Sequence, residues 1–263
     1  MSGETGSGGN KRKAKDKAFY IKSAKQAKRT AGELGPGMKG FLCTSNREKE
    51  SVREAYNLLN EHADLLFGTE APAAEEEEEV KVKLEIEDEL SKDLADLKQE
   101  HATPIAERRF QSVQSGIKGC IFIRTTVEDP SCVVDSILDK IEKDKQQATK
   151  FLLRMLPIHA TCKSVLDEIL KAVVPLLDKL DKFKNFSLLV KVRNHNYKSM
   201  DIIEPVADLV KKKYPEIEVK LDEPEVSIVI EVLRRNTCIG IVKNYSQRAK
   251  YNLVEFAERV SKP

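Results

Sequence analysis

Apolar residues change their spacing several times along the first part of the chain, and each change predicts a different element. Short apolar runs predict strands, whereas apolar residues at three- and four-residue steps predict helices. The predicted elements are a strand at 40–44, a helix from Val52 to Leu66, strands at 108–113 and 119–126, a helix at 130–145 and a strand at 151–157. This order, strand–helix–strand–strand–helix–strand, is typical of a ferredoxin-like domain.

The second half of the chain repeats this alternation with longer apolar runs. The predicted elements are a helix from Thr161 to about Leu180, a strand at 187–193, a helix at 201–213, and strands at 217–221, 226–233 and 237–245. Pro175 lacks a backbone donor, so it predicts a kink or two abutting helices. The last two strands are joined by about three residues, Arg234 to Asn236, which suits a hairpin with a basic tip. The fold class is therefore α+β, with a mixed sheet packed on helices.

The charge of the chain is unevenly distributed, although the formal net charge is only +2. Lys11 to Arg29 holds nine basic residues and one acid, whereas Glu70 to Glu100 holds thirteen acids and four lysines. From Phe151 onward, 20 Lys and Arg face 15 Asp and Glu. We therefore predict a disordered basic tail (1–37), a ferredoxin-like domain (38–148) with an acidic insertion at about 69–101, a second domain (149–256) and a C-terminal tail (257–263).

The pattern of cysteines and apolar runs narrows the class of protein. The five cysteines include no CxxC pair, so neither a disulfide framework nor a zinc site is predicted. No signal peptide and no apolar run long enough to span a bilayer is found, so we expect a soluble intracellular protein without a membrane partner.

Motifs for catalysis or cofactor binding are missing from the sequence. GxGxxG, GxxxxGK[ST], GxSxG and HExxH do not occur, so no cofactor, small-molecule substrate or metal is expected. His159 and Cys162 are three residues apart and could form a nucleophile pair. The structural interpretation is favoured, with Thr161 capping a helix and Cys162 packing inward, but an RNA-modifying enzyme stays open as an alternative.

Basic residues in and beside the C-terminal strands indicate binding of nucleic acid. In the strand 188–193, a period of two places Leu188, Val190 and Val192 on one face and Lys191 and Arg193 on the other. Cations on converging elements attract phosphates, and the lack of Trp favours folded RNA recognised by its shape. The candidate RNA-binding residues are Arg154, Lys163, Lys191, Arg193, Arg234, Arg235, Lys243, Arg248 and Lys250.

Three segments resemble a THUMP domain and its ferredoxin-like companion: Phe151-Leu-Leu-Arg-Met-Leu-Pro-Ile158 with Thr161-Cys-Lys163, the basic strand Val190-Lys-Val-Arg193, and Val219-x-Leu-x-x-Pro-x-x-x-Ile-x-Ile-Glu-Val232. Upstream, Glu54-Ala-Tyr-Asn-Leu-Leu-Asn60 and Arg108-Arg-Phe-Gln-Ser-Val-Gln-Ser-Gly116 resemble the THUMP domain-containing protein 1 family of eukaryotic tRNA acetylation adapters. The resemblance covers about residues 38 to 256.

The resemblance implies a non-catalytic tRNA-binding adapter. Such an adapter presents serine and leucine tRNAs to an RNA cytidine acetyltransferase, which forms N4-acetylcytidine in the D-arm and itself binds acetyl-CoA and ATP. The basic tail and this function predict residence in the nucleus or nucleolus, with the cytoplasm as a further compartment. The alternative is an RNA-independent protein–protein scaffold in RNA processing or ribosome assembly.

Overall fold

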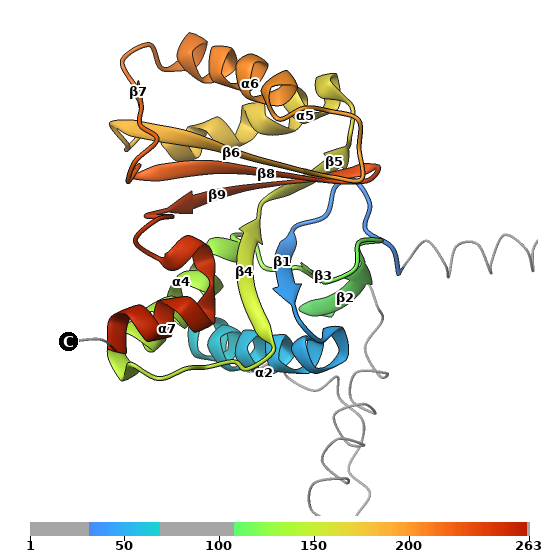
Figure 1. Cartoon of the computed structure of the whole chain (residues 1–263), viewed down its shortest axis with the longest axis vertical. Coiled ribbons are helices and arrows are strands. Elements are labelled where there is room, and N and C mark those ends of the chain that lie inside the picture. Colours follow the sequence, from blue (N-terminus) through green and yellow to red (C-terminus); the bar gives the residue numbers. More distant parts are fainter. Residues whose placement is uncertain (1–31, 69–107, 262–263) are drawn as a thin grey trace, which may run out of the picture. The chain divides into compact units, whose positions relative to one another are not determined.

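Four strands of the N-terminal half pair into one antiparallel sheet (Figure 1). The computed structural model describes residues 32–68 and 108–261. The strands β1 (Gly40–Ser45), β2 (Phe110–Gln114), β3 (Cys120–Thr125) and β4 (Leu152–Ile158) lie in the order β2-β3-β1-β4. Helices α2 (Glu48–Phe67) and α4 (Pro130–Asp144) cover one face of this sheet. The predicted sequence of strands and helices is therefore present.

Helix α4 shows how local signals place an element that later contributes to the site. Asp129 is its N-cap and accepts a hydrogen bond from Ser131 N (3.0 Å), while Pro130 occupies the start of the helix, where its missing N–H costs nothing. Lys145 ends the helix in a left-handed conformation (φ 53°). The face toward the sheet is apolar and buried, with Val133, Val134, Ile137, Leu138 and Ile141 in the core.

The second half forms a five-stranded mixed sheet. Its strands are β5 (Ala160–Lys163), β6 (Asn185–Arg193), β7 (Glu218–Val219), β8 (Val226–Leu233) and β9 (Asn236–Lys243), in the order β5-β9-β8-β6-β7. β6 is parallel to β7 and β8, whereas β9 is antiparallel to β8 and β5. Helices α5 (Leu166–Val173) and α6 (Met200–Lys213), with the 3₁₀ helix η1 (Val174–Leu180), lie on one face (Figure 1).

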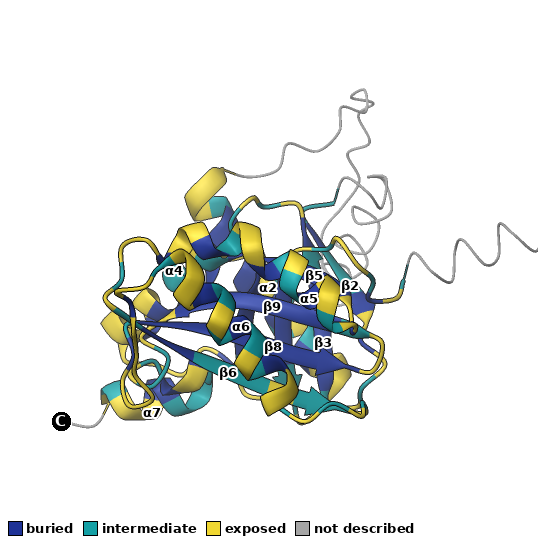
Figure 2. Ribbon diagram, turned by 90° about the horizontal axis from the view of Figure 1, so that it is seen from above, coloured by how far each residue is buried: buried dark blue, intermediate teal, exposed yellow. Residues whose placement is uncertain are grey.

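The strands β8 and β9 of this second sheet are buried on both faces and are dark blue in Figure 2. Ile228 and Ile230 pack into the core beneath α5 and α6, whereas Val229 and Leu233, on the other face of β8, pack into the core of the first sheet. The two sheets come close at Gly240, where an added Cβ would lie 2.2 Å from Pro157 O. A side chain at this position of β9 would therefore push the sheets apart.

The segment that precedes β1 joins the two sheets through hydrogen bonds. Leu34 N donates to Gln114 O (2.9 Å), and Asn236 Nδ2 donates to Leu34 O (2.7 Å). Met38 N donates to Thr161 Oγ1 (2.7 Å). The described residues from Leu34 onward form one compact unit, and Leu34 itself is buried, although the predicted tail extends to residue 37.

The predicted helix from Thr161 to about Leu180 is wrong at its start. Residues 160–163 form β5 and pair with β9, so Thr161 lies in a strand instead of capping a helix. α5 begins only at Leu166, and the chain changes to the 3₁₀ helix η1 at Val174, next to Pro175. The break predicted at Pro175 is confirmed.

Smaller differences concern chain reversals and a proline. β7 has two residues, fewer than predicted for 217–221, and the turn between β8 and β9 consists of Arg234 and Arg235 alone, since Asn236 is already in β9. The positive φ of Arg234 (56°) closes this two-residue turn. Pro205 lies inside α6, where it cannot donate a backbone hydrogen bond.

Two structural features bear on the predicted domain boundaries. β4 pairs with β1 and so belongs to the first sheet, although the predicted boundary lies between residues 148 and 149. Helix α7 (Leu253–Ser261) includes residues predicted as a tail, and it packs against α4 and β4 with Phe256 and Ala257 buried. The basic cluster at 11–29 and the acidic insertion at 69–101 lie outside the described residues. None of the helices within 32–68 and 108–261 is long and apolar enough to cross a bilayer.

Candidate nucleic-acid interface

The nine predicted RNA-binding residues fall into two groups near the two ends of β9. Asn236 begins β9 and pairs with Lys163 on one side and Leu233 on the other, whereas Lys243 ends β9 and pairs with Val226. An extended strand of this length separates its ends by roughly 24 Å. The two groups therefore form distinct surfaces.

The first group, here called the sheet-end cluster, consists of Lys163, Lys191, Arg193, Arg234 and Arg235. The parallel strands β6 and β8 end together, with Arg193 paired to Leu233, and the β8–β9 turn follows at once. Arg234 N donates to Arg193 O (3.0 Å), and Ser164 N donates to Arg235 O (2.9 Å), which places the end of β5 beside the turn. Strand pairing thus gathers these residues from three separate segments.

Four members of the sheet-end cluster carry free charge. Lys163, Lys191, Arg234 and Arg235 are exposed, and none forms an ion pair or a side-chain hydrogen bond with the part of the chain that the structure describes. Arg193 is different, because its Nε lies 3.2 Å from Oε2 of Glu231, whose side chain is only 5% exposed. Arg193 therefore serves first to neutralise a buried carboxylate.

The second group consists of Arg154, Lys243, Arg248 and Lys250. Arg248 forms an ion pair with Asp135, has a second carboxylate, that of Asp139, at 3.6 Å, and lies over the ring of Tyr251. Its charge is thus already balanced by α4. Arg154 is half-buried, and its Nε has no hydrogen-bond partner among the described residues. Lys243 and Lys250 are exposed.

His159 and Cys162 are engaged with other partners and do not form a nucleophile pair. Ile241 N donates to His159 Nδ1 (3.2 Å), while His159 Nε2 lies 3.1 Å from Asp129 Oδ1 and 3.0 Å from Ser131 Oγ. Cys162 packs into the core beneath α5 and α6, and burial raises the pKa of its thiol to about 11. A thiol that stays protonated at neutral pH is a poor nucleophile. Cys162 therefore packs inward as predicted, although Thr161 lies in β5 and does not cap a helix.

Alkylation of the native protein at pH 8 tests this account of Cys162. Cys132 is the exposed cysteine, whereas Cys43, Cys120, Cys162 and Cys238 are buried. We expect iodoacetamide to modify Cys132 alone, and slowly, because partial burial and the neighbouring Asp129 raise the pKa of its thiol. Peptide mass mapping before and after unfolding gives the pattern. Rapid native modification of Cys162 would contradict it and revive the enzyme alternative.

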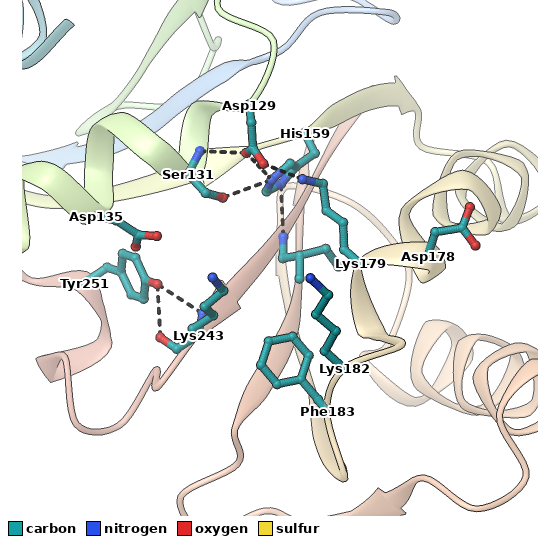
Figure 3. A pocket seen from close by; sticks show the side chains of 11 residues that line it. Asp129, Ser131, Asp135, His159, Asp178, Lys179, Lys182, Phe183, Lys243 and Tyr251 are labelled. Carbon is teal, nitrogen blue, oxygen red and sulfur yellow. Dashed lines mark hydrogen bonds and ion pairs between the residues drawn. The ribbon is translucent and has the colours of Figure 1, made fainter. Parts of the chain in front are cut away.

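A pocket of about 330 Å³ lies beside the second group (Figure 3). It is lined by the start of α4, by His159 after β4, and by the end of η1 with the residues that follow it. The end of β9 and Tyr251 complete the lining. The sequence patterns did not indicate Ser131, Lys179 or Lys182, since nothing local shows that they meet Lys243. Within the described ranges, no group of three or more His, Cys, Asp or Glu could hold a metal ion.

Comparison with known proteins defines first the domain and then the family. Residues 163–242, which span most of the second sheet and its helices, match the THUMP domain model. THUMP domain-containing protein 1 of Bos taurus is 37% identical over 260 residues, covering 94% of this chain and 71% of that protein. The human protein of the same name is 34% identical, covering 97% and 74%. The chain therefore belongs to the THUMP domain-containing protein 1 family, as its sequence motifs predicted.

A more distant relative carries a name that describes an activity. The protein called tRNA acetyltransferase TAN1, from Saccharomyces cerevisiae, is 26% identical over 289 residues, and the match covers 95% of this chain and 95% of that protein.

Proposed function

We propose that this chain is an RNA-binding adapter, which holds a tRNA for an RNA cytidine acetyltransferase and leaves the chemistry to that enzyme. The observation that carries the proposal is the sheet-end cluster, where four exposed cations without partners among the described residues converge in a chain that contains a THUMP domain. The name of the yeast relative supports a connection with tRNA acetylation.

The geometry of the cluster suits a phosphate backbone. Lys163 ends β5, and Lys191 lies near the end of β6. Arg234 and Arg235 form the β8–β9 turn, so the charges form a row where these strands end. Cations that neutralise phosphates release bound counterions, so affinity then depends steeply on salt. Aromatic residues make up 6% of the chain and Trp is lacking, which favours recognition of a folded RNA by shape over stacking on single-stranded bases.

The proposal extends to the substrate and the reaction through the family resemblance. The tRNAs are those for serine and leucine, and the product is N4-acetylcytidine in the D-arm. The adapter contributes by holding the tRNA in place, because fixing two reactants in the right geometry removes much of the entropic part of a barrier. Residence in the nucleus or nucleolus stays a prediction from the basic cluster at 11–29.

Reconstitution tests the proposal directly. A serine tRNA transcript is incubated with acetyl-CoA and ATP, together with this chain, an RNA cytidine acetyltransferase, or both, and N4-acetylcytidine is quantified by mass spectrometry. We expect product only when both proteins are present, and none with an alanine tRNA. Product from this chain alone would make it an enzyme, and equal product from the acetyltransferase alone would remove the need for an adapter.

A further inference from the structure

The pocket beside α4 has the size of a ligand site and is lined by groups from both sheets. Its volume of about 330 Å³ lies at the lower end of the range for small-ligand pockets, roughly 300–1,000 Å³. Three acids and three lysines line it: Asp129, Asp135, Asp178, Lys179, Lys182 and Lys243. Which of these charges are already balanced decides what the pocket can bind.

Each of the three carboxylates already has a cation partner. Asp129 Oδ2 lies 2.5 Å from Lys179 Nζ, Asp135 pairs with Arg248, and Asp178 pairs with Lys213. The pKa of Asp129 is held far below its usual value, mainly by the hydrogen bond from His159 and also by that from Lys179. The carboxylate of Asp129 therefore stays ionised at neutral pH, and the charge of each of the three carboxylates is neutralised by its cation partner.

Two of the lysines have no charged partner within residues 32–68 and 108–261. Lys182 follows η1, and Lys243 ends β9, so they approach the pocket from different segments. Neither side chain forms an ion pair or a hydrogen bond with another residue of the described ranges. Figure 3 shows their amino groups on two sides of the same space. With all acids balanced, these two ammonium groups give the pocket a net positive character.

The hydrogen bonds of His159 leave one neutral donor for the same space. Because His159 Nδ1 accepts from Ile241 N, the ring proton lies on Nε2, which is within hydrogen-bond distance of Asp129 Oδ1 and Ser131 Oγ. That single N–H is shared between the two oxygens, so Ser131 Oγ can only accept at this nitrogen, and its own hydrogen has no acceptor among the described residues. Ser131 also stands in the first turn of α4, where the helix dipole favours negative charge.

The geometry points to a binding site for one phosphate group, held by Lys182 and Lys243 and completed by the Ser131 hydroxyl. Two ammonium groups and a hydroxyl match the oxygen acceptors of a phosphate, which charge-assisted hydrogen bonds bind best. The phosphate comes either from an RNA backbone or from a free phosphate compound. The first source rests on the proposed tRNA binding, at a contact near the end of β9 opposite the sheet-end cluster, whereas the second does not.

The experiment compares Lys182→Gln with Lys243→Gln against a control with Lys143→Gln and Lys212→Gln. The control lysines are exposed, stand in the last turns of α4 and α6, and do not line the pocket. In the first arm, inorganic phosphate is added to the full-length protein at constant ionic strength, and the amide NMR signals of Ser131 and Ile241 are followed. In the second arm, tRNA affinity is measured between about 50 and 200 mM salt.

We expect phosphate to shift both amide signals in the wild type and the control, but not in the pocket variant. If the source is RNA, the pocket variant also loses about one unit of the salt slope and roughly fivefold to tenfold in affinity near 0.1 M salt. Phosphate-dependent shifts with unchanged tRNA binding identify a free phosphate compound. Unchanged NMR signals in the wild type together with an unchanged salt slope in the variant overturn the site. If the wild type binds no tRNA, the first arm still decides.

Discussion

Reversing Lys163 and Arg235 to glutamate is expected to lower the affinity for tRNA about a hundredfold near 0.1 M salt. Each phosphate contact contributes about 0.9 to the slope of log affinity against log salt, which is roughly eightfold in affinity at this concentration. Each of the two lost contacts lowers the affinity by this factor, and repulsion between the new glutamates and the phosphates lowers it further. Both side chains are exposed and unpaired in the described part of the chain, so the reversal leaves the fold intact.

Filter binding or fluorescence anisotropy at four salt concentrations measures this effect. The matched control reverses Lys143 and Lys212, which preserves the change in net charge but lies outside the cluster. We expect the slope to fall by about 2 in the cluster variant and to change little in the control. Equal losses in both variants would show that only net charge matters. Undiminished binding by the cluster variant would favour the RNA-independent scaffold.

Arg193 is left out of this variant because of its position in the structure. Reversing it would place a second carboxylate against Glu231, whose side chain is almost fully buried. The variant would then unfold or rearrange, and a loss of tRNA binding could not be assigned to a lost phosphate contact. Judged by charge and strand position, Arg193 and Lys191 are equivalent candidates for binding RNA. In the structure, only Lys191 of the two is exposed and unpaired within the described ranges.

Periodicity predicted the strand β6 and its two faces correctly. Leu188, Val190 and Val192 pack toward the helices, as the period of two required. The opposite face proved more buried than its charges suggested, because Leu189 packs against the core of the first sheet and Arg193 meets Glu231. Which residues cover the second face depends on packing between the two sheets, and a local pattern contains no information about that packing.

Partners distant in sequence explain what the patterns missed. β5 forms because residues 160–163 pair with 236–239, and the apolar residues that follow made this stretch look like the start of a helix. Arg248 pairs with Asp135, 113 residues earlier. The pocket is assembled in the same way, from α4, the β4–β5 connection, η1 and β9. Spacing along the chain identifies charged residues, but the fold decides which charges remain free.

Replacing Arg193 with methionine is expected to lower the free energy of unfolding by about 2–3 kcal/mol. Removing one partner of a buried ion pair costs roughly 3–5 kcal/mol, since the other charge stays buried without compensation. We expect the lower value because the side chain of Arg193 is 24% exposed, so water can partly solvate Glu231 in the variant. Methionine keeps the apolar stem and isolates the loss of the guanidinium.

A double-mutant cycle with Glu231→Met separates the structural role of Arg193 from a role in binding RNA. The paired variant, Arg193→Met with Glu231→Met, should recover to within about 1 kcal/mol of the wild type in urea unfolding, because no buried charge is left unpaired. If Arg193 only neutralises Glu231, this variant binds tRNA with the wild-type salt slope. A salt slope reduced by about 1 would instead add Arg193 to the residues that contact phosphate. If the paired variant is as unstable as Arg193→Met, the ion pair is not what stabilises this end of the sheet.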